Sequence, residues 1–351
     1  MPILEEKLSE MSQSKLFTKL DLSSGYWHVQ LDRESSLLTT FQTCFGRYRW
    51  CRLPFGLSVS SEIFQKKLCE AIGDLPGVVC ITDDLNVHGK TQVEHDERLD
   101  KLLSRCKEVG IKLSKSDDKL QYCMPEISFM GHLITREGVK SDPEKVKAVT
   151  EMPAPQNVGE LKRFLGMVNY LSKYLPNLSD VLHPLLNLTK KDVPWIWSEF
   201  HQSAFERVKV MVTSTPILAF YDVNKELTLE NDASEYGLGS VLLQEGRPVA
   251  FASRSLSSSE MNYAQIEKEM LAITFGLEKF HTYTFGRDVR VITDHKPLTS
   301  IMKKPLSKAP KRLQAFLLRT QAYTFELVYK PGQEIPVADT ISFTSKEQYR
   351  I

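Results

Sequence analysis

Two adjacent aspartates between two β-prone runs constrain the local fold of this chain more tightly than any other feature of its sequence. In GVVCITDDLNVHG, residues 78–82 form the first run, Asp83 and Asp84 follow, and residues 85–88 can return as a second strand. A two-residue connection is the tightest hairpin, so we expect the aspartate pair to form its tip. Because like charges at a tip repel each other, a divalent cation would neutralise them. The alternative is a plain solvated acidic turn.

Three further motifs surround this pair in a recognisable order. FTKLDLSSGYW delivers Asp21 at the end of a short apolar strand, FGRYRWCRLPFGL leads into a helix from about Ser60, and FMGHLIT follows the aspartate pair. In this order the four motifs resemble the reverse transcriptases of long-terminal-repeat retrotransposons of the gypsy type. The resemblance implies a palm domain and a polymerase that works on an RNA template, a DNA primer and dNTPs.

The same resemblance implies roles for particular residues. Asp21, Asp83 and Asp84 would bring together two Mg²⁺ (or Mn²⁺) ions roughly 3.5–4 Å apart, one at the primer 3′-hydroxyl and one at the leaving pyrophosphate. Tyr26 would act as a steric gate under the incoming sugar and Phe55 would line the nucleotide pocket; the alternative for both is ordinary core packing. Four residues would form the turn that grips the primer strand: Phe129, Met130, Gly131 and His132.

Two departures from the family pattern affect this first half. Ile81 stands where the family usually has Tyr, which removes an aromatic hydroxyl but no metal ligand. Only 16 residues precede FTKLD, whereas family members carry a longer segment that builds the fingers. We therefore expect a palm with truncated fingers, and weak or absent primer extension.

A second set of acidic residues begins in ELTLEND. Period-2 alternation places Glu230 and Asp232 on one face of a strand, with Leu229 and Asn231 on the other. Asp232 falls at the strand's end, before a turn of small residues.

The next acidic residue lies in an expected helix over residues 262–280. Ile266, Met270, Ile273 and Leu277 form its apolar stripe. Glu269 borders this stripe and therefore needs a partner, whereas Glu267 projects away from it as a surface charge. VRVITD then ends a further strand at Asp294, and PVADTIS places Asp339 near the start of a possible C-terminal helix.

Strand Asp, helix Glu, strand Asp and late Asp is the order of a ribonuclease H fold, and NDAS, EKEMLAI, TDHKPL and VADTIS resemble the RNase H domain of the same retrotransposon family. The resemblance implies that Asp232, Glu269, Asp294 and Asp339 hold two metal ions. These ions would promote attack by water on the RNA strand of an RNA–DNA hybrid. The family's frequent Asn and His before the last Asp are replaced by Ile335 and Tyr329, which leaves the final proton donor open.

A basic stretch accompanies these acidic residues. Between Asp294 and Glu326 there are seven Lys or Arg and no Asp or Glu, a pattern typical of phosphate contact or of a solvated helix face. We expect five of them to bind hybrid: Lys303, Lys304, Lys308, Lys311 and Arg312.

The pattern predicts an α+β and α/β multidomain fold. Residues 1–139 would form a palm with partial fingers, 140–222 a helical thumb or connection, 223–343 the RNase H-like domain, and 344–351 a tail. The sequence leaves the oligomeric state open. The predicted function is a retrotransposon-derived RNA-directed DNA polymerase with RNase H. The alternative is a truncated or host-retained remnant that binds RNA–DNA duplex without polymerising.

Composition limits the partners and the compartment that we expect for this chain. With 45 Lys+Arg against 44 Asp+Glu, the net charge of +1 argues against a protein that coats polyanions, but not against an enzyme with basic grooves. No apolar run approaches the roughly 20 residues that span a bilayer, so no membrane partner is expected. The six cysteines show no C-x-x-C spacing, which favours free thiols in a reducing compartment, cytoplasmic or nuclear.

Overall fold

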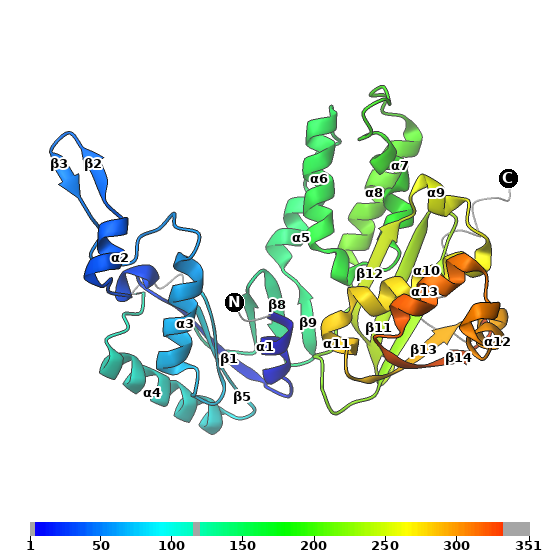
Figure 1. Cartoon of the computed structure of the whole chain (residues 1–351). Helices are drawn as coiled ribbons and strands as arrows, with labels where there is room; N and C mark the ends of the chain where they lie inside the picture. Colours follow the sequence, from blue (N-terminus) through cyan, green and yellow to red (C-terminus); the bar gives the residue numbers. More distant parts are fainter. Residues whose placement is uncertain (1–3, 115–119, 333–351) are drawn as a thin grey trace. The chain divides into compact units, whose positions relative to one another are not determined.

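The computed structural model describes residues 4–114 and 120–332. The chain divides into two compact units (Figure 1). The first unit contains residues up to 139 together with 220–222, and the second contains 140–219 and the residues from 223 onwards. No helix in the described part of the chain is long and apolar enough to cross a membrane.

The first unit is built on a four-stranded sheet in the order β4-β5-β1-β6. Its strands are β1 (Leu16–Asp21), β4 (Val78–Ile81), β5 (Asp84–Gly89) and β6 (Gln121–Met124). Its helices are α1 (Leu4–Glu10), α2 (Arg33–Leu38), α3 (Ser60–Ile72) and α4 (Gln92–Val109), with the short 3₁₀ helix η1 (Gly25–His28). Smaller hairpins are made by β2 (Phe41–Thr43) with β3 (Gly46–Tyr48), and by β7 (Glu126–Phe129) with β8 (His132–Thr135).

Helices α3 and α4 cover this sheet with their apolar faces. Phe64 and Leu68 of α3 and Leu102 of α4 pack with Leu20 and Leu85 of the sheet in one buried cluster. The sequence determines both ends of α4. The Thr91 side chain accepts a hydrogen bond from the Glu94 backbone N–H, and the chain leaves the helix at a glycine with φ of 76°.

The β4–β5 hairpin turns one residue earlier than the sequence indicated. Ile81 pairs with Asp84, so Thr82 and Asp83 form the turn, with Thr82 in the left-handed region at φ 51°. The prediction that Asp83 and Asp84 together form the tip is therefore wrong by one position: Asp84 is the first residue of β5. The buried residue Leu85 explains the register, because a shift of one residue would turn it away from the core.

The boundary between the units falls within strand β9 (Gly138–Ser141), which forms a sheet with β7 and β8. The second unit then continues with helices. The helical elements that follow are α5 (Pro143–Thr150), α6 (Val158–Tyr170), η3 (Ser172–Tyr174), α7 (Leu178–Asn187) and α8 (Glu199–Thr213). Their apolar stripes pack on one another, with Phe164 of α6 against Phe205 of α8 at 4.6 Å between ring centroids.

A five-stranded mixed sheet in the order β12-β11-β10-β13-β14 forms the rest of the second unit. Its strands are β10 (Leu227–Ala233), β11 (Gly237–Gln244), β12 (Arg247–Ser255), β13 (Asp288–Thr293) and β14 (Thr324–Tyr329). Strands β10, β11 and β12 are antiparallel neighbours, whereas β13 runs parallel to both β10 and β14. The helices of this part are α9 (Ser258–Met261), α10 (Gln265–Lys279), α11 (His281–Thr284), α12 (Lys296–Met302) and α13 (Lys311–Thr320), with the 3₁₀ helix η4 (Leu306–Lys308).

Helices lie on both faces of this sheet. Helix α10 approaches so closely that a Cβ on Gly276 would lie 2.3 Å from Ser240 Oγ and 2.4 Å from Asn231 Oδ1. Helix α7 approaches the opposite face, where a Cβ on Gly237 would lie 2.3 Å from Ser179 Oγ. The helix expected over residues 262–280 starts at Gln265. The mixture of helices and sheets in the two units confirms the predicted fold class.

Candidate active sites

The first candidate site lies where β1 ends beside the β4–β5 turn. Asp21 and Asp84 are partners across the antiparallel pair β1–β5, a position that brings Cβ atoms within about 5.5 Å. The backbone N–H of Leu22 donates to the carbonyl of Asp83 at 2.9 Å and so holds the turn against the end of β1. The fold thus places the backbones of the three aspartates next to one another, and their role as ligands stays a prediction.

A glycine lies directly against this cluster. A Cβ on Gly25 would lie 2.0 Å from Asp83 Oδ1 and 2.9 Å from the ring of Phe64, so any larger residue would force the Asp83 carboxylate to move. The turn after Asp21 therefore approaches the Asp83 carboxylate closely only because residue 25 has no side chain.

A lysine already neutralises part of the first site. Lys19 stands two residues before Asp21 on the same face of β1, and its Nζ lies 3.3 Å from Asp84 Oδ1. Both side chains are about three-quarters buried, at 23% and 25% exposed. The sequence motifs gave no role to this lysine, although it stands only two positions before Asp21.

The two aromatic residues predicted to bind nucleotide lie together. The rings of Tyr26 and Phe55 are 4.8 Å apart between centroids, and Tyr26 also packs edge-on against Phe64. The Tyr26 hydroxyl lies 2.9 Å from Ser61 Oγ. Phe55 is 62% exposed, which leaves its ring accessible to a ligand.

The predicted primer-gripping turn is only partly accessible. Phe129 pairs with His132 across the β7–β8 hairpin, and both side chains are buried. Met130 and Gly131 form the two-residue turn with φ of 51° and 76°, as a type I′ turn requires. A nucleic-acid strand at this hairpin would therefore meet the Met130–Gly131 tip first.

A cavity opens beside the turn that follows Asp21. Its volume is about 710 Å³, and its lining includes Ser23, Trp27, Trp50, Arg52 and Lys112. Tryptophan rings and basic side chains together suit nucleic acid, because bases stack on the rings while phosphates meet the positive charges. Arg52 and Lys112 come from separate segments of the chain, so no local sequence pattern pointed to either of them.

The second candidate site lies at the carboxyl ends of two neighbouring parallel strands. Glu230 of β10 is in register with Ile292 of β13, so the same register continued by two residues brings Asp232 beside Asp294. Glu269 comes from α10, and its Oε1 accepts a hydrogen bond of 2.6 Å from Gln265 Nε2. The same Gln265 amide donates to the carbonyl of Ala233, next to Asp232, and thereby joins helix and strand.

Mutual repulsion and burial change the protonation of this site. Burial, with the nearby charges of Asp294 and Asp180, raises the pKa of Asp232 to about 6. Burial and the charges of Asp232 and Asp294 raise the pKa of Glu269 to about 8, against the lowering effect of its bond from Gln265. Three acidic side chains from distant parts of the sequence therefore share one electrostatic environment.

A fourth acidic residue of this environment was not predicted from the sequence. Asp180, on α7, accepts a hydrogen bond of 2.6 Å from Ser234 Oγ, two residues after Asp232. Burial raises its own pKa. Asp180 reaches this place because Gly237 on β11 leaves room: a Cβ there would lie 2.8 Å from Asp180 Oδ1.

The remaining predicted residues of the second half are placed differently. Asp339 lies outside the described residues. Glu267, expected as a solvated charge, pairs instead with Arg312 at 2.7 Å and accepts the Ala264 N–H at the start of α10. Arg312 also stacks over the Tyr263 ring at 4.0 Å. All five predicted hybrid-binding residues, including Arg312, are exposed; the other four are Lys303, Lys304, Lys308 and Lys311.

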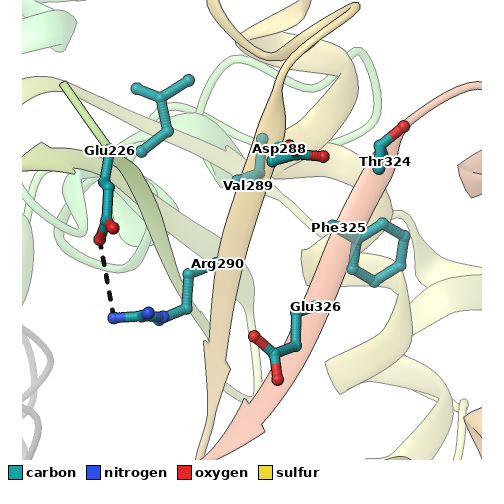
Figure 2. A pocket seen from close by; sticks show the side chains of 8 residues that line it. Glu226, Asp288, Val289, Arg290, Thr324, Phe325 and Glu326 are labelled. Atoms are coloured by element: carbon teal, nitrogen blue, oxygen red, sulfur yellow. Dashed lines mark ion pairs between the residues drawn. The ribbon is translucent and has the colours of Figure 1, made fainter. Parts of the chain in front are cut away.

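A pocket of about 370 Å³ lies at the opposite ends of the same strands (Figure 2). Glu226, Asp288 and Glu326 contribute to its lining, and Arg290 forms an ion pair with Glu226 at 4.0 Å. Since Asp232 and Asp294 lie at the carboxyl ends of β10 and β13, this pocket is not part of the carboxylate site.

Both sites have the chemistry of a divalent-cation site. As the side chains stand in residues 4–114 and 120–332, no three His, Cys, Asp or Glu groups converge closely enough to hold a metal ion. The donors nevertheless fit one: they are carboxylate oxygens, which Mg²⁺ prefers, and the shared repulsion of Asp232, Glu269 and Asp294 is what a bound cation relieves.

Comparison with known families defines the class of protein. Residues 2–134 match the family described as reverse transcriptase (RNA-dependent DNA polymerase), and residues 197–291 match the RNase H-like domain found in reverse transcriptase. The fold agrees: solved structures of the foamy viral protease-reverse transcriptase match 92–93% of the chain with TM-scores of 0.80 and 0.82 at 23% identity, over 45% and 58% of those chains. The class is a reverse transcriptase palm followed by an RNase H-like domain.

Curated relatives narrow this class. The chain is 35% identical over 360 residues to the retrovirus-related Pol polyprotein from transposon opus of Drosophila melanogaster, and 33% identical over 358 residues to that from transposon gypsy. It is 32% identical over 351 residues to the transposon Tf2-3 polyprotein of Schizosaccharomyces pombe. Each match covers 97% of this chain but only 36%, 34% and 26% of the relative. The chain belongs to the reverse transcriptase and RNase H part of the retrotransposon Pol family, as the sequence motifs indicated.

Proposed function

We propose that this chain acts as an RNA-directed DNA polymerase and ribonuclease H, and that each activity uses its own carboxylate cluster with two divalent cations. Its partners would be an RNA template, a DNA primer, dNTPs and the RNA–DNA hybrid that forms between them. The proposed domains are those of the sequence: palm (1–139), thumb or connection (140–222) and RNase H (223–343), followed by the tail. The free cysteines suit a reducing intracellular compartment, cytoplasmic or nuclear.

One observation carries the nuclease half. Asp232 is the second-last residue of β10, Asp294 follows β13 and Glu269 comes from α10. Burial and the charges of Asp232 and Asp294 nevertheless raise the pKa of Glu269 together. Gathering carboxylates costs free energy unless a cation or protons compensate their repulsion. A fold that gathers them at the carboxyl ends of parallel strands is therefore suited to binding divalent cations.

Within the nuclease site, the chain's own residues would orient the substrate and the attacking water. Asp232, Glu269 and Asp294 would hold the cations, joined by Asp339, and Gln265 would keep Glu269 in position through the bond at 2.6 Å. The bound cations would supply charge stabilisation at the phosphate and a more acidic water. The exposed lysines from Lys303 to Lys311 would contact hybrid phosphates, which fixes position without reading sequence.

In the palm, Asp21, Asp83 and Asp84 would hold the cations beside the primer end. Tyr26 and Phe55 would contact the incoming nucleotide, since Phe55 exposes most of its ring. The turn formed by Met130 and Gly131 would touch the primer, while Phe129 and His132 hold that hairpin from within. Support for this half comes from the register of Asp21 with Asp84 and from the close approach of Gly25 to Asp83.

Foamy viral structures support the nucleic-acid partners. One is described as a complex with RNA/DNA hybrid and another as a complex with double-stranded DNA, and both share the fold of this chain.

The deciding experiment follows a labelled RNA–DNA hybrid incubated with the full chain and Mg²⁺. We expect cleavage of the RNA strand by the parent protein and none by Asp232→Asn. A Glu235→Gln variant is the control, because Glu235 is exposed on the turn just after Asp232. Binding of hybrid by the parent protein without cleavage would support the alternative of a non-catalytic remnant. Equal cleavage by Asp232→Asn would refute the assignment of the site.

A further inference from the structure

A pair of cysteines connects helix α3 to the strand that leads into the palm aspartates. Cys69 lies on α3 and Cys80 on β4, three residues before Asp83. Their sulfur atoms are 4.0 Å apart, and neither cysteine takes part in a disulfide. Cys69 is exposed and Cys80 is buried, so a reagent in solution reaches the first and not the second.

Gln65 holds the two cysteines in a fixed arrangement. Its Nε2 lies 3.3 Å from Cys69 Sγ and donates to the backbone carbonyl of Cys80 at 3.0 Å. Its Oε1 accepts the backbone N–H of Thr82 at 2.7 Å, in the turn that carries Asp83. The same side chain therefore orders both sulfur-bearing segments and the turn that carries Asp83.

From this geometry we infer that Cys69 and Cys80 form a redox modification site, in which a low-molecular-weight disulfide converts the two thiols into an intramolecular disulfide. A disulfide needs the sulfurs at about 2.05 Å. The sulfurs must therefore close by about 2 Å, a movement on the scale of a side-chain rotation. The bridge would tie α3 to the hairpin that presents Asp83 and Asp84. This inference does not rest on the proposed activities.

The exchange proceeds in two balanced steps with oxidised glutathione as the oxidant. Cys69 loses its proton and attacks one glutathione sulfur; the glutathione S–S bond breaks and one reduced glutathione leaves. Cys80 then loses its proton and attacks Cys69 Sγ, and the second glutathione leaves. Two protein thiols are oxidised while one oxidised glutathione becomes two reduced molecules.

The order of the steps follows from exposure. Burial raises the pKa of Cys80 to about 12, which keeps this thiol protonated and unreactive toward solutes. Cys69 therefore reacts first, and Cys80 reacts only with the sulfur held beside it.

Peptide mapping tests the inference directly. The full chain is incubated with oxidised glutathione, free thiols are blocked with iodoacetamide, and the protein is digested with trypsin. Residues 68–90 form a single tryptic fragment, because no Lys or Arg lies between Leu68 and Lys90. We expect this fragment without alkyl groups and two hydrogens lighter than the reduced form. Cleavage before Asp74 should leave two pieces that separate only on reduction.

Variants and a denatured control make the outcome decisive. Cys69→Ser should abolish the bridged fragment, whereas Cys44→Ser, which removes another exposed thiol, should leave its yield unchanged. The same treatment in a denaturant should lower the yield several-fold, because the two sulfurs then lose their fixed distance. Stable glutathione on Cys69 with Cys80 still open to alkylation, or an equal yield in denaturant, would overturn the proposal.

Discussion

The two carboxylate sites of this chain manage the same electrostatic problem in different ways. The palm site keeps a positive charge of its own, since Lys19 lies 3.3 Å from Asp84. In the RNase H site, the charges that shift the pKa of Asp232 and Glu269 are all negative among the described residues. The palm cluster is therefore partly compensated without metal, whereas the RNase H cluster depends on protons or cations.

The largest expected effect concerns Glu269. Glu269→Gln keeps the shape of the side chain but removes a charge that would hold a cation. We expect hybrid cleavage to fall roughly 100-fold or more, the scale on which loss of one preorganised charge slows catalysis. The comparison is Glu278→Gln on the same helix, where Glu278 pairs with Arg319 at the surface at 2.6 Å. Equal rates of hybrid cleavage for the two variants would show that Glu269 takes no part in the reaction.

The second-largest expected effect is a difference between the two units in how their stability without metal depends on pH. The folded-state pKa of Glu269 is raised from 4.5 to about 8, so its contribution to stability is complete below pH 4.5 and is lost as the pH rises toward 8. At 1.36 kcal/mol for each pH unit, the loss reaches at most about 5 kcal/mol. Hydrogen exchange of β10 in a chelator measures it.

Two controls accompany this experiment. Added Mg²⁺ should restore protection of β10 at pH 8, and Glu269→Gln should remove the pH dependence between pH 6 and 8, leaving at lower pH the contribution of Asp232, whose pKa is about 6. A profile in the chelator that stays flat between pH 5 and 8 would contradict the shared repulsion of the site.

The palm unit should respond in the opposite direction through His88. Burial, reinforced by the charge of Arg98, lowers the pKa of His88 to about 4. A depressed histidine pKa contributes stability above about pH 6.5 that is lost as the pH falls through 4, on the order of 3 kcal/mol. The protection factors of the β5 amides against hydrogen exchange should therefore fall in acid.

His88→Gln should flatten that acid response, because glutamine does not titrate. His281→Gln in the second unit is the matched control, and it should leave the exchange of β5 unchanged. Earlier opening of β10 than of β5 in acid would reverse the proposed contrast between the units.

Much of both sites could be predicted from the sequence, because the acidic residues stand at the ends of strands or beside the apolar stripe of a helix. Asp21, Asp83 and Asp84 were assigned from motif order, and the fold brings them together. The register of the turn was not predictable locally: burial of Leu85 decided it. The assignments as metal ligands remain predictions.

Long-range packing explains what the sequence reading missed. Asp180 precedes Asp232 by 52 positions, and only the packing of α7 against Gly237 brings it near. Glycines in a strand do indicate a close approach, but not the segment that approaches. Phe129 and His132 show the converse. The sequence indicated that they grip the primer, but the hairpin that positions these two side chains also buries them.

The smallest expected effect tests Lys19 itself. If its ammonium group compensates Asp84 in the absence of metal, then an incoming cation must displace it, and Lys19→Met should strengthen binding of Mn²⁺ to the palm. A partly exposed ion pair contributes about 1 kcal/mol, so the dissociation constant should fall about fivefold. The measurement is Mn²⁺ titration followed by water-proton relaxation, in a background with Asp232→Asn to weaken the second site. Lys15→Met, just before β1, removes the same charge without the contact to Asp84. Equal affinities in the two variants would mean that the positive charge of Lys19 does not compete with the metal, and the two sites would then differ in burial alone.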